Sequence, residues 1–103
     1  MPVDRMEILK NMVAQNPTDA FARYGLAMEN VNQGNLEGAV EQFQQLLQHN
    51  PTYAAGYFHC GQTFEKLGKT EEARTIYIKG IEVTTQTGDA HTKSELQSAL
   101  ASL

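Results

Sequence analysis

The sequence predicts an all-α fold, an α-solenoid of about six helices packed as antiparallel pairs, from three observations. The chain repeats at a period of 34 residues, because Asn16-Pro17-Thr18 recurs as Asn50-Pro51-Thr52. Apolar residues between these marks follow the three- and four-residue spacing of amphipathic helices. Glycines and prolines stand where the apolar stripes stop, which is where helices end. A period of this length in a helical sequence is typical of a repeat architecture.

The composition is that of an ordinary globular domain. The chain has 103 residues, of which 41% are hydrophobic and 19% charged, enough for one modest core. The net charge of −4 is spread without a basic stripe, which argues against binding to nucleic acid or an anionic membrane. No apolar run approaches the ~20 residues of a membrane span, and the N-terminus does not resemble a signal peptide. The single cysteine, Cys60, cannot form an internal disulfide; this suits a reducing compartment, and we expect a cytoplasmic protein.

The first helix is predicted over residues 4–15. Asp4 can cap its free amides, and Pro17 ends it because the residue before a proline is disfavoured in the helical conformation. Its apolar stripe consists of Ile8, Leu9, Met12 and Val13.

The second helix is predicted over residues 19–33 and ends at Gly34, which can adopt the left-handed conformation without strain. Asn35 caps the third helix, and Pro51 ends it. The predicted core positions of the third helix are Leu36, Ala39, Val40, Phe43, Leu46 and Leu47.

The fourth helix is predicted over residues 53–67 with Gly68 as its terminator, and the fifth begins at Thr70. Thr85 stands where the period would place the next proline, so we expect the fifth helix to run about one turn longer and stop near Gly88. The last helix is predicted over residues 89–102. Its apolar residues form one narrow stripe and its other face is polar, which suits a terminal cap. The stripe consists of Leu96, Ala99, Leu100 and Leu103.

Two successive helix pairs resemble tetratricopeptide repeats, whose signature is a 34-residue helix–turn–helix. The matching features are small residues in the first helices, glycine turns, small-then-aromatic pairs in the second helices and a closing proline. The small residues are Ala27 and Gly61, and the turns are Gly34-Asn35 and Gly68-Lys69. The pairs are Ala39 with Phe43 and Ala73 with Tyr77, and the closing proline is Pro51. The resemblance implies a right-handed superhelix and a single domain over residues 1–103. Its parts are a leading helix (1–17), two repeats (20–53 and 54–87) and a C-terminal capping helix (88–103).

The sequence departs from the family pattern at a few positions. The early aromatic of the first helix is Tyr57 in the second repeat but Arg23 in the first, and the mid-helix aromatic is Phe64 in the second repeat but Asn30 in the first. Gly80 stands where a small residue or alanine is usual. These departures concern local packing, and the fold expectation stands.

The resemblance implies a non-enzymatic protein-interaction module that binds a peptide or helical segment of a partner protein in a concave groove. The first helix of each pair lines that groove. The side chains expected to bind are Phe21, Tyr24, Met28, Asn32, Phe58, His59, Gln62, Lys66 and Lys93. The same spacing is compatible with burial of Tyr24, Met28, Phe58 and His59 against a neighbouring helix, and both interpretations stay open.

Other kinds of site find little support in the sequence. The basic clamp by which some family members hold a C-terminal carboxylate is absent, because its positions hold Tyr24, Met28 and His59, with Lys93 the one basic residue. Adjacent His59 and Cys60 point about 100° apart on a helix and cannot share a metal ion easily. No nucleophile–base motif or glycine-rich phosphate loop is present, so we expect no metal, cofactor or enzymatic activity. The alternative function is that of a self-associating structural protein, a homodimer formed through the exposed stripe of the first helix.

Overall fold

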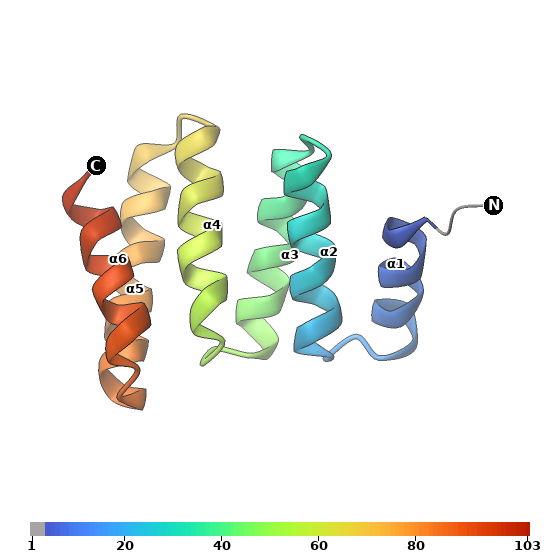
Figure 1. Cartoon of the computed structure of the whole chain (residues 1–103), viewed down its shortest axis with the longest axis horizontal. Helices are drawn as coiled ribbons and strands as arrows, with labels where there is room; N and C mark the ends of the chain where they lie inside the picture. Colours follow the sequence, from blue (N-terminus) through green and yellow to red (C-terminus); the bar gives the residue numbers. More distant parts are fainter. Residues whose placement is uncertain (1–3) are drawn as a thin grey trace.

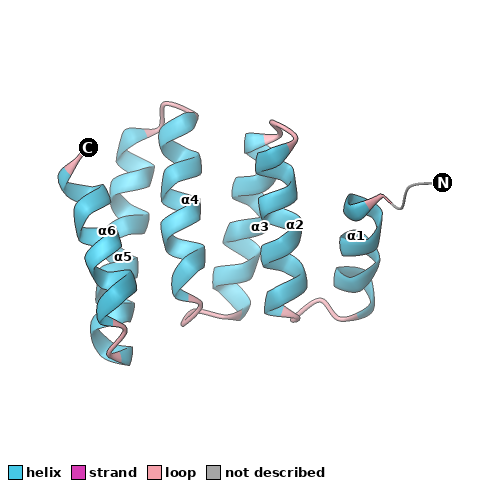
Figure 2. Cartoon of the chain, in the orientation of Figure 1, coloured by secondary structure: helices cyan, strands magenta, loops and turns pink. Residues whose placement is uncertain are grey.

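The computed structural model describes residues 4–103, and over this range it is all-α. Six helices follow one another without a strand (Figures 1 and 2). Their bounds are α1 Arg5–Gln15, α2 Ala20–Asn32, α3 Leu36–His49, α4 Ala54–Lys66, α5 Thr70–Thr87 and α6 Ala90–Ala101. The predicted all-α solenoid of six helices is confirmed. The described chain measures 44 × 28 × 19 Å, with α2, α4 and α6 in front of α3 and α5 in the view of Figure 1.

Side-chain caps and glycine turns set the helix ends as the sequence predicts. Asp4 accepts a hydrogen bond from the Met6 amide, and Asp19 accepts one from the Ala22 amide. Asn35 and Asp89 cap α3 and α6 in the same way. Gly34, Gly68 and Gly88 have φ of 79°, 76° and 77°, a region in which a β-carbon would be strained. The extra turn expected in the fifth helix is present, because α5 has 18 residues and α3 has 14.

The core lies between the two helices of each pair. The small and aromatic residues of the predicted pairs, Ala39 with Phe43 and Ala73 with Tyr77, are fully buried. Gly61 shows why a small residue is needed, since a β-carbon there would lie 2.2 Å from the Tyr77 ring. Contacts of this kind hold the two helices close enough for dense packing.

Arg23, which replaces the early aromatic residue of the first repeat, makes the same hydrogen bond to a proline carbonyl as Tyr57 in the second repeat. Tyr57 donates its hydroxyl to the Pro51 carbonyl at 2.7 Å, and Arg23 Nη2 donates to the Pro17 carbonyl at 3.0 Å. Donor and acceptor both shift by one 34-residue period. Arg23 Nη1 also donates to Gln42 Oε1 at 2.9 Å. A long polar side chain therefore replaces the aromatic one and ties α2 to the preceding loop and to α3.

The expected apolar stripe of α1 is only partly buried. Met6 and Leu9 are buried, whereas Ile8 is 45% exposed and Met12 36% exposed. The physical reason is that α1 packs mainly on α2, so a single neighbour covers only one narrow strip of it. In α3 the residue that corresponds to Met12 is Leu46, which is fully buried.

Candidate functional site

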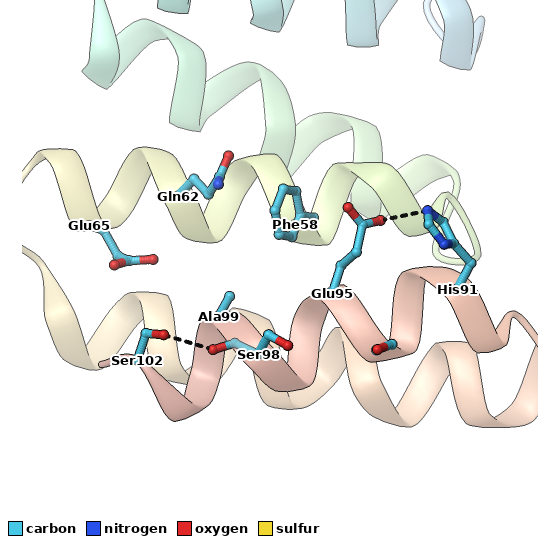
Figure 3. A pocket seen from close by; sticks show the side chains of 9 residues that line it. Phe58, Gln62, Glu65, His91, Glu95, Ser98, Ala99 and Ser102 are labelled. Carbon is cyan, nitrogen blue, oxygen red and sulfur yellow. Dashed lines mark hydrogen bonds and ion pairs between the residues drawn. The ribbon is translucent and has the colours of Figure 1, made fainter.

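The front surface formed by α2, α4 and α6 contains a groove between α4 and α6. It encloses about 520 Å³ and lies between two parallel helices in Figure 3. Side chains of α4 form one wall and side chains of α6 form the other. The lining residues are Phe58, Gln62, Glu65, His91, Ser94, Glu95, Ser98, Ala99 and Ser102.

The register of α6 decides which of its side chains face this groove. Helix α6 begins 36 residues after α4, at Ala90 instead of at the position that a 34-residue period would give. Helix α5 has four residues more than α3, and the linker after α5 has two residues fewer than the linker after α3, which together shift α6 by two residues. The binding side chains expected in α4 are Phe58, His59, Gln62 and Lys66. Adding 36 gives Ser94, Glu95, Ser98 and Ser102, and all four line the groove.

The same shift corrects the placement of Lys93. A 34-residue spacing puts Lys93 level with His59, but the observed spacing makes it correspond to Tyr57, which is buried. Lys93 is half-buried and does not line the α4–α6 groove. The sequence held the signal for this correction, since the missing proline at Thr85 predicted the longer helix.

Tyr24 and His59 lie in a cluster of rings that joins α2 to α4. The Tyr24 ring centroid is 5.3 Å from that of Tyr53, 5.8 Å from that of His59 and 6.4 Å from that of Phe43. Burial, followed by the neighbouring Tyr53, raises the pKa of Tyr24. Burial lowers the pKa of His59; Glu95 opposes this effect and Lys66 adds to it. His59 is therefore neutral at pH 7 and adds no positive charge to the surface.

The remaining predicted binding residues divide by exposure. Phe21 is 72% exposed, an unusual position for a phenylalanine. Asn32, Gln62 and Lys66 are exposed as well. Met28 and Phe58 are half-buried and pack against the core from the front surface. Gln62 and Phe58 reach the α4–α6 groove, whereas Phe21, Met28 and Asn32 belong to α2 and do not line it.

Two carboxylates that line the groove, those of Glu65 and Glu95, were not predicted from the sequence. Glu65 accepts a hydrogen bond from the hydroxyl of the buried Tyr77, and Glu95 Oε1 lies 3.4 Å from His91 Nε2. Glu65 was not among the predicted binding residues. Its groove position follows from the α4–α6 packing, and that of Glu95 follows from the register shift.

The thiol of Cys60 lies in the core and not on the surface. Cys60 is fully buried, and burial raises the pKa of its thiol to about 12, so it packs as a small apolar side chain. Within residues 4–103 no three His, Cys, Asp or Glu side chains are grouped so that they could hold a metal ion. None of the described helices has the length and apolar character needed to cross a membrane.

The arrangement defines a class, the α-solenoid built from helix pairs, and comparisons with known proteins identify the family. A family model described as a TPR repeat matches residues 29–68, and one described as a tetratricopeptide repeat matches residues 54–87. A crystal structure of a tetratricopeptide repeat domain protein from Salinibacter ruber is 37% identical, with a TM-score of 0.76 over 82% of this chain and 93% of that chain. The chain belongs to the tetratricopeptide repeat family.

Two further relatives cover most of the chain. A TPR repeat-containing protein of Pseudomonas aeruginosa is 28% identical over 91 residues, which is 88% of this chain and 87% of that protein. The type III secretion translocator chaperone SycD of Yersinia enterocolitica is 13% identical, with a TM-score of 0.86 over 94% of this chain and 68% of that chain. At this identity the likeness to SycD concerns the fold alone. Membership of the family supports a role in protein–protein interaction, and the family is typically non-enzymatic.

Proposed function

We propose that this protein is a non-enzymatic interaction module that binds a peptide or helical segment of a partner protein on the surface formed by α2, α4 and α6. The observation that carries the proposal is that this surface combines a groove of about 520 Å³ with exposed Phe21 and half-buried Phe58. Accessible aromatic side chains on a grooved surface are typical anchors for a partner segment. We also retain the division into a leading helix, two repeats and a cap as a proposal.

Other observations support a protein partner. SycD, which shares the fold, is described as a chaperone of secretion translocators, and a chaperone acts on another protein. The surface offers rings, amides and hydroxyls, which suit polypeptide recognition, and the net charge of −4 gives no support for a nucleic-acid or membrane partner. One buried unpaired thiol suits the cytoplasm as location.

The test compares two exposed apolar residues on different surfaces. Phe21→Ala removes the most exposed aromatic of the proposed binding surface, and Ile78→Ala removes a side chain of α5 that is 50% exposed. Both changes should alter the free energy of unfolding by less than about 0.5 kcal/mol, because neither side chain is in the core. A partner recovered by affinity capture should then bind Phe21→Ala at least about tenfold more weakly, as expected for an aromatic anchor. Equal affinities of wild type, Phe21→Ala and Ile78→Ala would place binding elsewhere.

A second candidate is self-association through α1, favoured by the exposure of Ile8 and Met12. These side chains occupy a face that a further helix covers in the full repeats, and a symmetric pair of α1 helices would cover it. Light scattering coupled to size exclusion measures the mass directly. A dimer that Met12→Lys dissociates would support this candidate, and a monomer at high concentration would eliminate it.

A further inference from the structure

We infer that the α4–α6 groove selects a basic amphipathic segment, with one apolar side chain on Phe58 and Ala99 and lysine or arginine side chains beside Glu65 and Glu95. The inference rests on the proposed function and deepens it, because it names the chemistry of the partner. A preference for basic segments would distinguish this protein from family members that hold a C-terminal carboxylate through a basic clamp.

The floor of the groove has one apolar patch between two carboxylates. Phe58 and Ala99 lie near the middle in Figure 3, with Glu65 toward one end and Glu95 toward the other. Seven residues separate Phe58 from Glu65 along α4, which corresponds to about 10 Å of helix. A segment that crosses the groove therefore meets a carboxylate on either side of its apolar anchor.

The charges around the groove favour a cation over an anion. Neither lysine nor arginine lines it, and within residues 4–103 Glu95 has only His91 as an ion-pair partner while Glu65 has none. Lys66 lies at the edge, where it lines a smaller hollow with Gln62 and Glu65. The two carboxylates lie in the groove and the Lys66 ammonium lies only at its edge, so the groove has a negative potential that attracts basic side chains.

Glu65 is held in place for such a contact. The hydroxyl of Tyr77 donates to Glu65 Oε2, and the Tyr77 ring is fixed in the core between close-packed helices. The other carboxylate oxygen is available to accept from a guanidinium or ammonium group. A carboxylate that is already oriented loses less side-chain entropy on binding than a free one.

The α6 wall provides polar groups for the rest of the segment. Ser94, Ser98 and Ser102 recur at four-residue spacing along it. Ser102 Oγ donates to the Ser98 carbonyl at 3.0 Å. Hydroxyls both donate and accept hydrogen bonds, so this wall can contact the backbone of the segment without demanding one sequence.

The experiment is a selection with a phage-displayed library of random short peptides on the full chain. We expect enrichment of peptides with lysine or arginine on both sides of an apolar residue. For a synthetic peptide of that pattern, the double variant Glu65→Gln/Glu95→Gln should bind about tenfold more weakly, the sum of two partly exposed ion pairs. Glutamine at position 65 still accepts from Tyr77, so the fold is preserved. About 1 M NaCl should weaken wild-type binding to a similar extent.

The control is Glu37→Gln/Glu41→Gln, which removes the same charge from exposed positions of α3, and it should bind like wild type. Enrichment of acidic or uncharged peptides would overturn the inference and leave the proposed function standing. Equal weakening by both double variants would also overturn it, because net charge rather than the groove would then govern affinity. Enrichment of no peptide at all would contradict the proposed function itself.

Discussion

At the scale of the residue, the sequence predicts burial well where a side chain has neighbours in its own repeat. Ala39, Phe43 and Leu46 were expected in the core from their positions in the third helix, and all three are fully buried. The outcome at Tyr24 could not be predicted, since its burial depends on Tyr53, which precedes α4, and on His59 of α4, across the interface between two helix pairs. Spacing along one helix defines a face, but it does not say how far the next pair covers that face.

His59 provides a prediction for pH. Burial lowers its pKa in the folded protein below the ordinary value of 6.5, so the unfolded chain binds a proton more readily. Stability should therefore fall as the pH drops through about 6.5 toward the folded-state pKa. Urea unfolding at about pH 7.5 and about pH 5.5, a window in which carboxylates contribute little, measures the loss.

The His59→Gln variant should lose less stability than wild type between these two pH values. His91→Gln is the matched control, because His91 is exposed. If His59→Gln and wild type lose the same stability, protonation of His59 is not the cause.

At the scale of the element, helix bounds follow from caps and punctuation, whereas relative register does not. Asp19, Gly34 and Asn35 mark the ends of α2 and α3 within a residue or two of the predicted bounds. The surface that α6 presents depends on the length of α5 and of the linker after it, which together displace α6 by two residues from the 34-residue frame. Because the 34-residue spacing was applied unchanged beyond Gly88, the prediction chose Lys93 in α6 and missed the serines that face the groove.

Thr85→Pro tests the importance of the longer α5. Proline would remove an amide from the last turn and clash with the preceding turn, at a cost of about 3 kcal/mol in the free energy of unfolding. It would also disturb the start of α6 and weaken binding in the α4–α6 groove. Thr85 is exposed, although its hydroxyl donates to the Ile81 carbonyl at 2.7 Å.

Thr85→Ala is the control for the lost hydroxyl, and it should cost less than about 1 kcal/mol. Urea unfolding compares the three proteins. Similar costs for proline and alanine would show that the last turn of α5 contributes little to the stability of the α5–α6 end.

At the scale of the whole molecule, the helices differ in how many neighbours support them. Helix α1 packs mainly on α2, whereas α4 packs on α3, α5 and α6. In a solenoid each unit contacts its neighbours along one dimension, so stability decreases toward an end with few contacts. The sequence predicted the order of the units and an exposed stripe on the first helix, and the structure shows that Ile8 and Met12 are the exposed residues of that stripe.

Native-state hydrogen exchange should therefore show α1 opening before the centre of the chain. Backbone amides of α1 are expected to exchange with a lower opening free energy than those of α4. Amides of α6, which has α4 and α5 as neighbours, should fall between the two. Exchange of α1 and α4 with the same opening free energy would mean that the chain unfolds in a single cooperative step.

The tight contact at Gly61 has a consequence for polymerisation. A copy stacked end to end would pair its α1 with α6 of the next copy, which would complete a repeat. In that pair, Gln97 corresponds to Gly61 by the observed register, and Arg5 corresponds to Ala39 and Ala73 by the repeat period. A β-carbon at Gly61 already collides with Tyr77, so two long polar side chains would keep the helices apart. Open-ended filament growth is thereby disfavoured, and a closed two-fold contact between α1 helices is unaffected.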